Sequence, residues 1–325
     1  MAYFGSVRFF KNLIFAVYIA TIALSVVLCV QANTELAAAR QEVEELTRQV
    51  QSYQERAQAF SPLSTVVAKD DDPSVPYADG TEQTVEGSES DATFEAPAYQ
   101  ELFPDFYAPQ EVTADQQTDK TAYLTFDDGP SSCTDRILDI LADHGITATF
   151  YVVANDDEVT AQRLQRIVDE GHTLGMHSGS HQYRSIYSSV EAFLEDMYQV
   201  FCLIRDVTGV APTTFRCPGG SINTYNYGIY QEILAEMLRR GFVPCDWNLS
   251  AEDAITDKIS SGEIVHNIVD DAPNFNRAFI LMHDSEAKTS TVNALDEVIT
   301  QLTEQGFTFQ SVTPEVKPML FGYDD

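Results

Sequence analysis

The architecture of this chain follows from residues 122–153, which read AYLTFDDGPSSCTDRILDILADHGITATFYVV. Residues 122–126 form a β-rich run that ends in Asp-Asp-Gly-Pro, and residues 147–153 form a second β-rich run. Between them, residues 133–144 carry apolar side chains at helical spacing and stop at Gly145. A helix between two such runs predicts two parallel strands joined by a right-handed crossover.

The same alternation repeats along the rest of the chain. Further strands are expected at 173–176, 213–216, 242–247, 278–283 and 307–312, and further helices at 160–170, 190–208, 227–240, 261–270 and 292–305. Seven strands that alternate with helices predict a parallel α/β sheet, which either closes like a barrel or stays open and doubly wound. In both arrangements ligands bind at the carboxyl ends of the strands.

A membrane anchor is expected at the N-terminus. Residues 13–30 contain no charge over 18 positions, which is long enough to cross the hydrocarbon core of a bilayer. Arg8 and Lys11 precede this run, and no positive charge follows it before Arg40. We therefore expect residues 1–32 to be a cytoplasmic tip and a single membrane span, with the remainder extracellular. A cleaved secretory signal is the alternative, but the apolar run is longer than usual for one.

A stalk and a linker are expected after the anchor. Apolar side chains recur in a heptad pattern from Leu36 to Phe60, which predicts a coiled-coil stalk over residues 33–60. Such a stalk would form a homodimer, whereas a lone amphipathic helix is the alternative. Residues 61–118 lose this periodicity and contain 13 acidic residues and six prolines, which predicts an acidic disordered linker. Within it, the aromatic-rich residues 97–109 are expected to pack against the folded domain.

The composition excludes several classes of function. The chain has 50 acidic and 19 basic residues and a formal net charge of −31, so no basic surface is available for nucleic acid. Its five cysteines are odd in number and form no CxxC pair, so neither a disulfide framework nor a zinc knuckle is expected.

Polar residues gather where the expected strands end. In chain order they are Asp127, Asp128, His177, His181, Arg216, Asp246, Asp253 and His283. The spacing His177-x3-His181 would place two imidazoles on one face of a helical turn, where they form a metal site once a third ligand is added. None of these groups identifies a function by itself. Asp-Asp-Gly-Pro, for example, is also a common turn composition.

Taken together, five segments resemble the motifs of the polysaccharide deacetylases, carbohydrate esterase family 4. They are Thr125-Phe-Asp-Asp-Gly-Pro130, His177-x3-His181, Arg216-x-Pro218-Gly-Gly220, Asp246-Trp-Asn-x-Ser-x-Asp253 and Leu281-x-His283. The resemblance covers about residues 120–315 and is strongest to membrane-anchored peptidoglycan N-acetylglucosamine deacetylases of Gram-positive bacteria. It implies a distorted seven-stranded (β/α) barrel over residues 119–325. It also implies a metal-dependent hydrolase that removes the acetyl group from N-acetylglucosamine in extracellular glycan, with peptidoglycan as the first choice of substrate.

The resemblance also implies a metal site and a general base. Asp128, His177 and His181 would hold a divalent metal ion, with zinc as the first choice and cobalt, nickel or manganese as alternatives. Asp127 would be the base, because on an extended strand its side chain points away from that of Asp128. Arg216 would pair with Asp127 and keep it ionised.

The other roles concern the acetyl group and the leaving amine. The backbone N–H of Gly219 would stabilise the oxyanion, and Trp247 and Leu281 would line the site with apolar surface. His283 would protonate the departing amine, and Asp253 would hold its imidazole once the barrel brings the two strand ends together.

Two departures from the family pattern bear on the substrate. Gly219 stands where many relatives have tyrosine, and Ala254 stands where many have tryptophan, so the walls of the groove differ. Another acetylated polysaccharide, such as poly-N-acetylglucosamine, chitin oligomers or xylan, is therefore an alternative substrate. A glycan-binding scaffold is the remaining alternative, which the loss of a metal ligand would have favoured.

Overall fold

A computed structural model describes residues 96–109, 120–255 and 258–322. All of them belong to one structural unit, residues 90–325. The expected anchor (1–32), stalk (33–60) and most of the linker lie outside the described residues. Within the described ranges, no helix combines the length and the apolar character that a membrane span requires.

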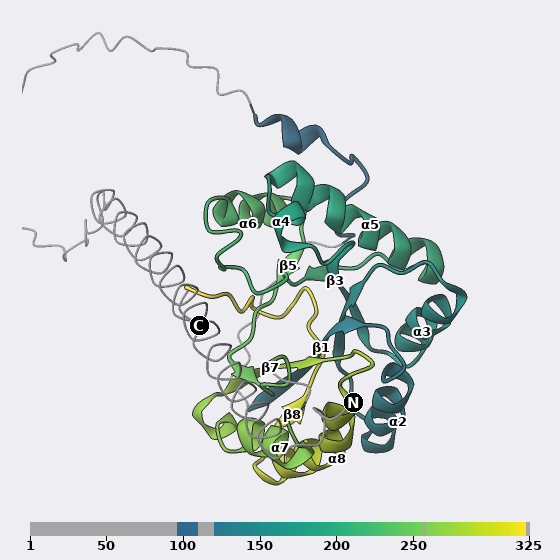
Figure 1. Ribbon diagram of the computed structural model, residues 1–325, viewed down its shortest axis with the longest axis vertical. Coiled ribbons are helices and arrows are strands. Elements are labelled where there is room, and N and C mark those ends of the chain that lie inside the picture. Colours follow the sequence, from purple (N-terminus) through teal and green to yellow (C-terminus); the bar gives the residue numbers. More distant parts are fainter. Residues whose placement is uncertain (1–95, 110–119, 256–257, 323–325) are drawn as a thin grey trace, which may run out of the picture. The chain divides into compact units, whose positions relative to one another are not determined.

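One curled sheet of parallel strands forms the centre of the domain (Figure 1). Its strands are β1 (Thr121–Gly129), β2 (Thr149–Val153), β3 (Thr173–Ser178), β4 (Thr214–Phe215), β5 (Val243–Pro244), β6 (Leu249–Ser250), β7 (Arg277–His283) and β8 (Thr308–Phe309). Their order is β5-β4-β3-β2-β1-β7-β6, and β8 pairs with the first residues of β1. The parallel α/β prediction is confirmed.

The sheet differs from the expected seven-stranded barrel in two respects. It has eight strands, and the described strands β5 and β6 stand at the two ends of the order without pairing to each other. Instead, the free edge of β5 is bridged by Met319 through Cys245. At the other end of the order, the side chain of Asn248, the residue before β6, binds the paired strand β7: it accepts from the N–H of Phe279 at 2.8 Å and donates to the carbonyl of Arg277 at 2.8 Å. The barrel is therefore a curled half-barrel with an open seam.

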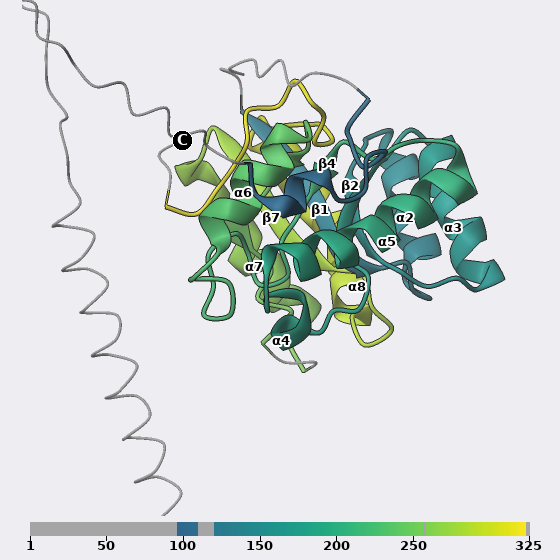
Figure 2. The same cartoon turned by 90° about the horizontal axis from the view of Figure 1, so that it is seen from above.

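Helices cover the outer face of the curl (Figures 1 and 2). They are α2 (Thr134–His144), α3 (Glu158–Asp169), α4 (Tyr183–Ile186), α5 (Val190–Thr208), α6 (Tyr230–Arg239), α7 (Ser261–Val269) and α8 (Thr289–Glu304), with short 3₁₀ turns η1 (Ala98–Glu101) and η2 (Ala272–Asn274). Local chemistry sets their ends. Asp157 and Ser189 cap α3 and α5 by accepting from backbone N–H groups, and α2 ends at Gly145 in the left-handed region.

The strands place apolar residues on both faces and the polar site at one end. Leu124 and Phe126 face the helices and join the main core, whereas Tyr123 faces the inside of the curl and stacks on Phe279 at 4.4 Å between ring centroids. Because side chains alternate along a strand, Thr125 and Asp127 follow Tyr123 on the inner face. The inner aromatic layer thus forms the floor beneath the polar residues at the strand ends.

Residues 96–109, here called the docking segment, pack against the domain as expected. Phe106 is completely buried, and its ring lies 4.8 Å from that of Phe242 and 5.1 Å from that of Phe201. The buried Arg240 guanidinium donates to four carbonyl groups of the segment, those of Tyr99, Leu102, Phe103 and Phe106. A fixed guanidinium thereby satisfies the backbone of a segment that forms little regular structure.

Candidate active site

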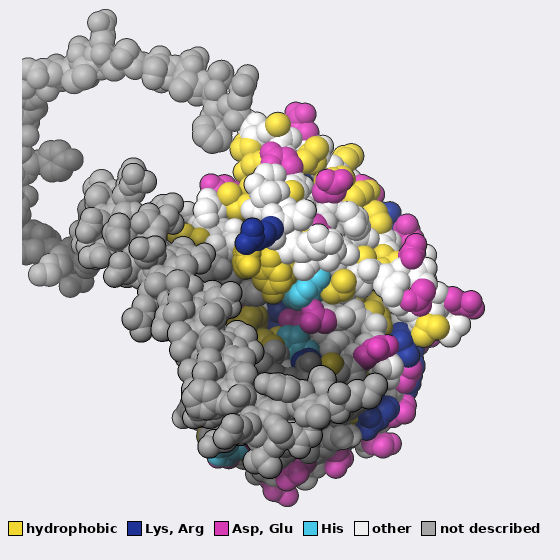
Figure 3. All heavy atoms as spheres, in the orientation of Figure 1, with side chains coloured by type: hydrophobic (Ala, Val, Ile, Leu, Met, Phe, Trp, Pro, Cys, Tyr) yellow, Lys and Arg dark blue, Asp and Glu magenta, His cyan; other side chains and the backbone are white. Residues whose placement is uncertain are grey.

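Histidine and acidic side chains lie together in a hollow on one face of the domain (Figure 3). The end of β1 supplies Asp127 and Asp128. The pairing register of β1 with β2 shifts between Asp127 and Gly129, and Asp128 has φ 71°. A bulge therefore turns the Asp128 carboxylate away from that of Asp127. The two carboxylates separate as expected, but through this bulge rather than through the alternation of an extended strand.

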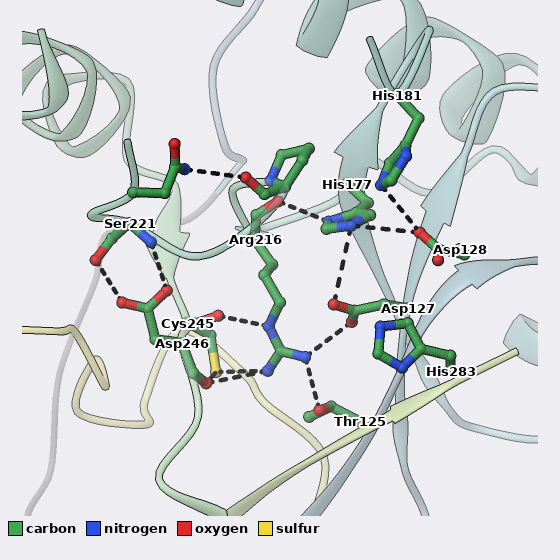
Figure 4. A network of polar contacts seen from close by, with 12 residues as sticks. Thr125, Asp127, Asp128, His177, His181, Arg216, Ser221, Cys245, Asp246 and His283 are labelled. Atoms are coloured by element: carbon green, nitrogen blue, oxygen red, sulfur yellow. Dashed lines mark hydrogen bonds and ion pairs between the residues drawn. The ribbon is translucent and has the colours of Figure 1, made fainter. Parts of the chain in front are cut away.

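Asp128, His177 and His181 form one cluster (Figure 4). Oδ1 of Asp128 lies 3.5 Å from Nε2 of His177 and 3.2 Å from Nε2 of His181, and the three ligand atoms lie within 4.8 Å of one another. The expected helical turn between the two histidines is wrong. His177 belongs to β3, and His181 lies in the following loop with φ 54°.

The loop that carries His181 is held by Asp196 of α5. This buried carboxylate accepts from the Ser178 hydroxyl at 2.6 Å and from the backbone N–H groups of Gly179 at 2.8 Å and Ser180 at 2.9 Å. The Ser178 hydroxyl in turn accepts from the His181 N–H at 2.8 Å. Sequence reasoning missed Asp196, because nothing in a helical aspartate indicates that it faces inward.

The cluster fits a divalent metal ion. Oδ1 of Asp128 is buried and has no hydrogen-bond partner among the described residues, which is costly unless a cation binds there. Tetrahedral ligands about 2.1 Å from zinc lie about 3.4 Å apart, close to the distances from Oδ1 to the two imidazoles. The His177 Nδ1–H donates to the Arg216 carbonyl at 2.9 Å, which leaves Nε2 free to bind. Burial lowers the pKa of His181 despite the nearby Asp128 carboxylate, so a neutral ligand is favoured.

Arg216 and Asp127 form a buried ion pair directly below this cluster. Nη1 of Arg216 donates to Oδ1 of Asp127 and to the Thr125 hydroxyl, both at 2.8 Å. Nε donates to the Cys245 carbonyl at 2.7 Å, and the guanidinium lies 4.4 Å from the Tyr151 ring centroid. Burial opposes the charge of Arg216, but the Asp127 carboxylate holds the pKa of Arg216 above its ordinary value. Arg216 is therefore a fixed cation.

His283 and Asp253 form a second pair beside Asp127. In the β1–β7 register His283 lies opposite Asp127. Its Nδ1 is 2.7 Å from Oδ1 of Asp253, and its backbone N–H donates to Oδ2 at 3.0 Å. Burial lowers the pKa of His283, but the hydrogen bond and charge of Asp253 outweigh burial, and the pKa lies above its ordinary value. Burial raises the pKa of Asp253, but the His283 contacts bring it below its ordinary value.

The remaining expected residues form the walls. Gly219 has φ 77° in the turn after Arg216, and its N–H makes no hydrogen bond with any described residue. Trp247 is half-buried, with its ring edge-on to Phe321 at 4.8 Å between centroids. Leu281 is buried and precedes His283 by two positions, so both lie on one face of β7.

Two other carboxylates near the site have structural partners. Asp246 accepts from the N–H groups of Ser221 at 2.8 Å and of Phe321 at 2.7 Å, so it holds the C-terminal segment against the turn that follows Gly219. Asp284 accepts from the hydroxyl groups of Ser131 at 2.6 Å and Thr134 at 2.5 Å. Sequence reasoning missed this structural role of Asp284. The available signal was the pair of hydroxyl residues, Ser131 and Thr134, just after Asp-Asp-Gly-Pro.

Comparisons with known proteins agree on one family. A family model described as polysaccharide deacetylase matches residues 114–237. The peptidoglycan-N-acetylglucosamine deacetylase of Bacillus cereus is 30% identical over 211 residues, which cover 63% of this chain and 74% of that protein. The catalytic domain of a peptidoglycan N-acetylglucosamine deacetylase from Eubacterium rectale superposes with a TM-score of 0.61 and 33% identity, over 66% of this chain and 97% of that one. A polysaccharide deacetylase from Bacillus cereus superposes with a TM-score of 0.57 and 28% identity, over 63% of this chain and 98% of that one.

Proposed function

Since the chain belongs to the polysaccharide deacetylase family, we propose that its substrate is peptidoglycan, in which it hydrolyses the N-acetyl group of N-acetylglucosamine residues. The observation that carries this proposal is a metal-fitting cluster of Asp128, His177 and His181 flanked by two carboxylate ion pairs. Amide hydrolysis needs an activated water, a stabilised oxyanion and a protonated amine, and the site has a group for each.

The metal would be held by Asp128, His177 and His181. Zinc is the first choice for two imidazoles and one carboxylate, and cobalt, nickel and manganese are the other candidates. When bound, such an ion lowers the pKa of a water molecule and polarises the acetyl carbonyl group.

The base in this mechanism is Asp127. Its Oδ2 lies 3.9 Å from Nε2 of His177, beside the ligand cluster, while its Oδ1 is held by Arg216. In this position the carboxylate accepts the proton of the attacking water, and the guanidinium keeps it oriented. The free N–H of Gly219 donates to the oxyanion that develops on the acetyl oxygen.

The acid is His283. Its Nδ1 is engaged by Asp253 at 2.7 Å, so Nε2 carries the proton that the departing amine receives. Because the pKa of His283 is raised, the imidazole remains protonated over a wider pH range than an isolated histidine. Trp247 and Leu281 provide the apolar surface beside the acetyl methyl group.

The test is acetate release from purified, N-acetylated peptidoglycan by the purified full chain. We expect release with a divalent ion present, loss of release with a chelator, and recovery on addition of zinc. Chitin oligomers and acetylated xylan serve as parallel substrates. Faster release from either of these than from peptidoglycan would contradict the proposed substrate, and no release from any would leave only glycan binding.

We also propose that residues 1–32 anchor the protein, that residues 33–60 pair two copies, and that the catalytic domain is extracellular. The support is the uncharged run 13–30 behind Arg8 and Lys11, and the heptad pattern that follows it. Protease treatment of intact cells should remove the domain while the anchor stays in the membrane fraction. Recovery of the protein from the medium with an N-terminus near Asn33 would contradict the anchor.

A further inference from the structure

A second hollow adjoins the metal-ligand cluster. It has a volume of about 540 Å³ and is lined by Gln182, Tyr183, Arg184, Ser185 and Tyr225. This volume lies within the range of cavities that bind small ligands. The hollow begins at the residue after His181, so a glycan whose acetyl group reaches the metal cluster would extend a neighbouring sugar into it.

Two tyrosines form the wall of this hollow. The Tyr183 ring stands edge-on to the His181 ring at 5.4 Å and lies 5.3 Å from the Tyr225 ring, which is 48% exposed. Tyr183 also occupies the space beside Gly219, where an added Cβ would come within 2.8 Å of its Cε1 atom. The absence of a side chain at Gly219 therefore makes room for Tyr183. Flat aromatic rings offer a surface for the C–H faces of a pyranose ring.

Arg184 lines the same hollow and brings a positive charge to it. Each of the other described arginines donates to a carboxylate, a carbonyl or an amide oxygen: Arg136, Arg163, Arg166, Arg205, Arg216, Arg239, Arg240 and Arg277. Arg184 is exposed and has no such partner within the described part of the chain. In a chain of net charge −31, this guanidinium is therefore available to an anionic ligand. Figure 3 shows basic, hydrophobic and histidine side chains adjoining on this face.

We propose that Tyr183, Tyr225 and Arg184 form a subsite for a carboxylate-bearing sugar unit next to the N-acetylglucosamine that is deacetylated. The inference rests on the proposed function and narrows its substrate to an anionic glycan. The tyrosine rings contact the sugar, and the Arg184 guanidinium binds its carboxylate through paired N–H donors. In peptidoglycan the carboxylate belongs either to the lactyl group of a muramic acid unit or to the stem peptide attached to it.

The experiment compares kcat and KM for acetate release by the metal-loaded full chain on five substrates. They are glycan strands with the stem peptides removed, strands that retain the peptides, both kinds of strand with their carboxylates converted to primary amides, and chitin oligomers of equal length. The first two separate the lactyl carboxylate from the peptide carboxylates. Arg184→Gln is compared with Arg136→Gln, which removes the same charge from an exposed position on α2.

For Arg184→Gln we expect KM to rise about tenfold on the strand type whose carboxylate is bound, with kcat unchanged. On amidated strands and chitin oligomers, the KM of Arg184→Gln should equal that of the unmodified protein. For Arg136→Gln, kcat and KM should equal those of the unmodified protein on every substrate. Tyr225→Ala should raise KM on all glycans, and Tyr225→Phe should restore it. The subsite is overturned if Arg184→Gln changes KM equally on charged and neutral glycans or on none. The proposed function fails separately, if the unmodified protein releases no acetate from any strand.

Discussion

At the scale of single residues, Asp127 and Asp128 are neighbours in the chain with different surroundings. Asp127 is buried against Arg216, whereas Asp128 has an unpartnered buried oxygen that faces two imidazoles. We therefore expect Asp127→Asn to keep its metal and lose turnover by about 10²-fold to 10⁴-fold, since it removes a base. His177→Ala and His181→Ala should lose the metal itself. Elemental analysis of the purified variants separates the two outcomes, and equal metal loss in Asp127→Asn would contradict the separate roles.

His283 and Asp253 give a prediction about pH. Asp253 raises the pKa of His283, and the imidazole must be protonated to release the amine, so activity falls as the pH rises through that pKa. Asp253→Asn removes the carboxylate charge and should lower the pKa, which moves the basic limb of the rate–pH profile to lower pH. The acidic limb should not move.

A second substrate provides the control for this assignment. His283→Ala should slow hydrolysis of the amide far more than hydrolysis of an activated acetyl ester, because the leaving group of the ester needs no proton. Equal slowing on the two substrates, or movement of the acidic limb alone in Asp253→Asn, would show that His283 is not the acid.

The sequence could predict which residues meet in the site, but not the backbone conformation that orients Asp128 and His181. Asp253 and His283 follow strands whose ends meet at one edge of a parallel sheet, so their contact follows from topology. The left-handed backbone conformation of Asp128 and His181 does not follow from topology. A positive φ at a residue other than glycine is disfavoured locally and is imposed by surrounding contacts. Arg184 is a further case, because a missing partner becomes visible only when its neighbours are placed.

At the scale of elements, the long strands and helices could be predicted and the short ones could not. The run 242–247 predicts one strand, but only Val243–Pro244 pair with β4, because the chain leaves the sheet at Asp246 to bind Ser221 and Phe321. β6 is two residues long and has no recognisable pattern of its own. The amide of Asn248 extends the contact of this short strand with β7, because it accepts from the N–H of Phe279 and donates to the carbonyl of Arg277.

The turn between β3 and α4 gives a prediction about an element. The carboxylate of Asp196 accepts hydrogen bonds from this turn, and the turn positions His181. Asp196→Asn replaces one acceptor oxygen by an amide donor, so we expect metal affinity to fall about 10-fold to 100-fold. Isothermal titration calorimetry with the metal ion measures the change in affinity. Glu195→Gln makes the same charge change at an exposed position of α5 and should have no effect. Equal affinities for both variants would show that the turn does not position His181.

At the scale of the whole molecule, the docking segment connects the catalytic domain to the part of the chain that precedes it. Phe106 is completely buried among Tyr198, Phe201 and Phe242, so it joins α5 to the chain that leads into β5. None of these residues belongs to the metal cluster or to either ion pair. The segment should therefore govern the stability of the domain without entering its chemistry.

Phe106→Ala tests this separation of stability from chemistry. Removing a buried aromatic ring should lower the free energy of unfolding by about 3–5 kcal/mol, because the cavity left behind closes only in part. Urea denaturation measures the loss. The matched change Tyr107→Ala removes a ring that is 39% exposed and should cost less than about 1 kcal/mol. Metal content and kcat, measured well below the unfolding transition, should stay unchanged in both variants. A lower kcat in the folded Phe106→Ala protein would show that the segment also shapes the site, through β5 and the Arg216 contacts that follow it.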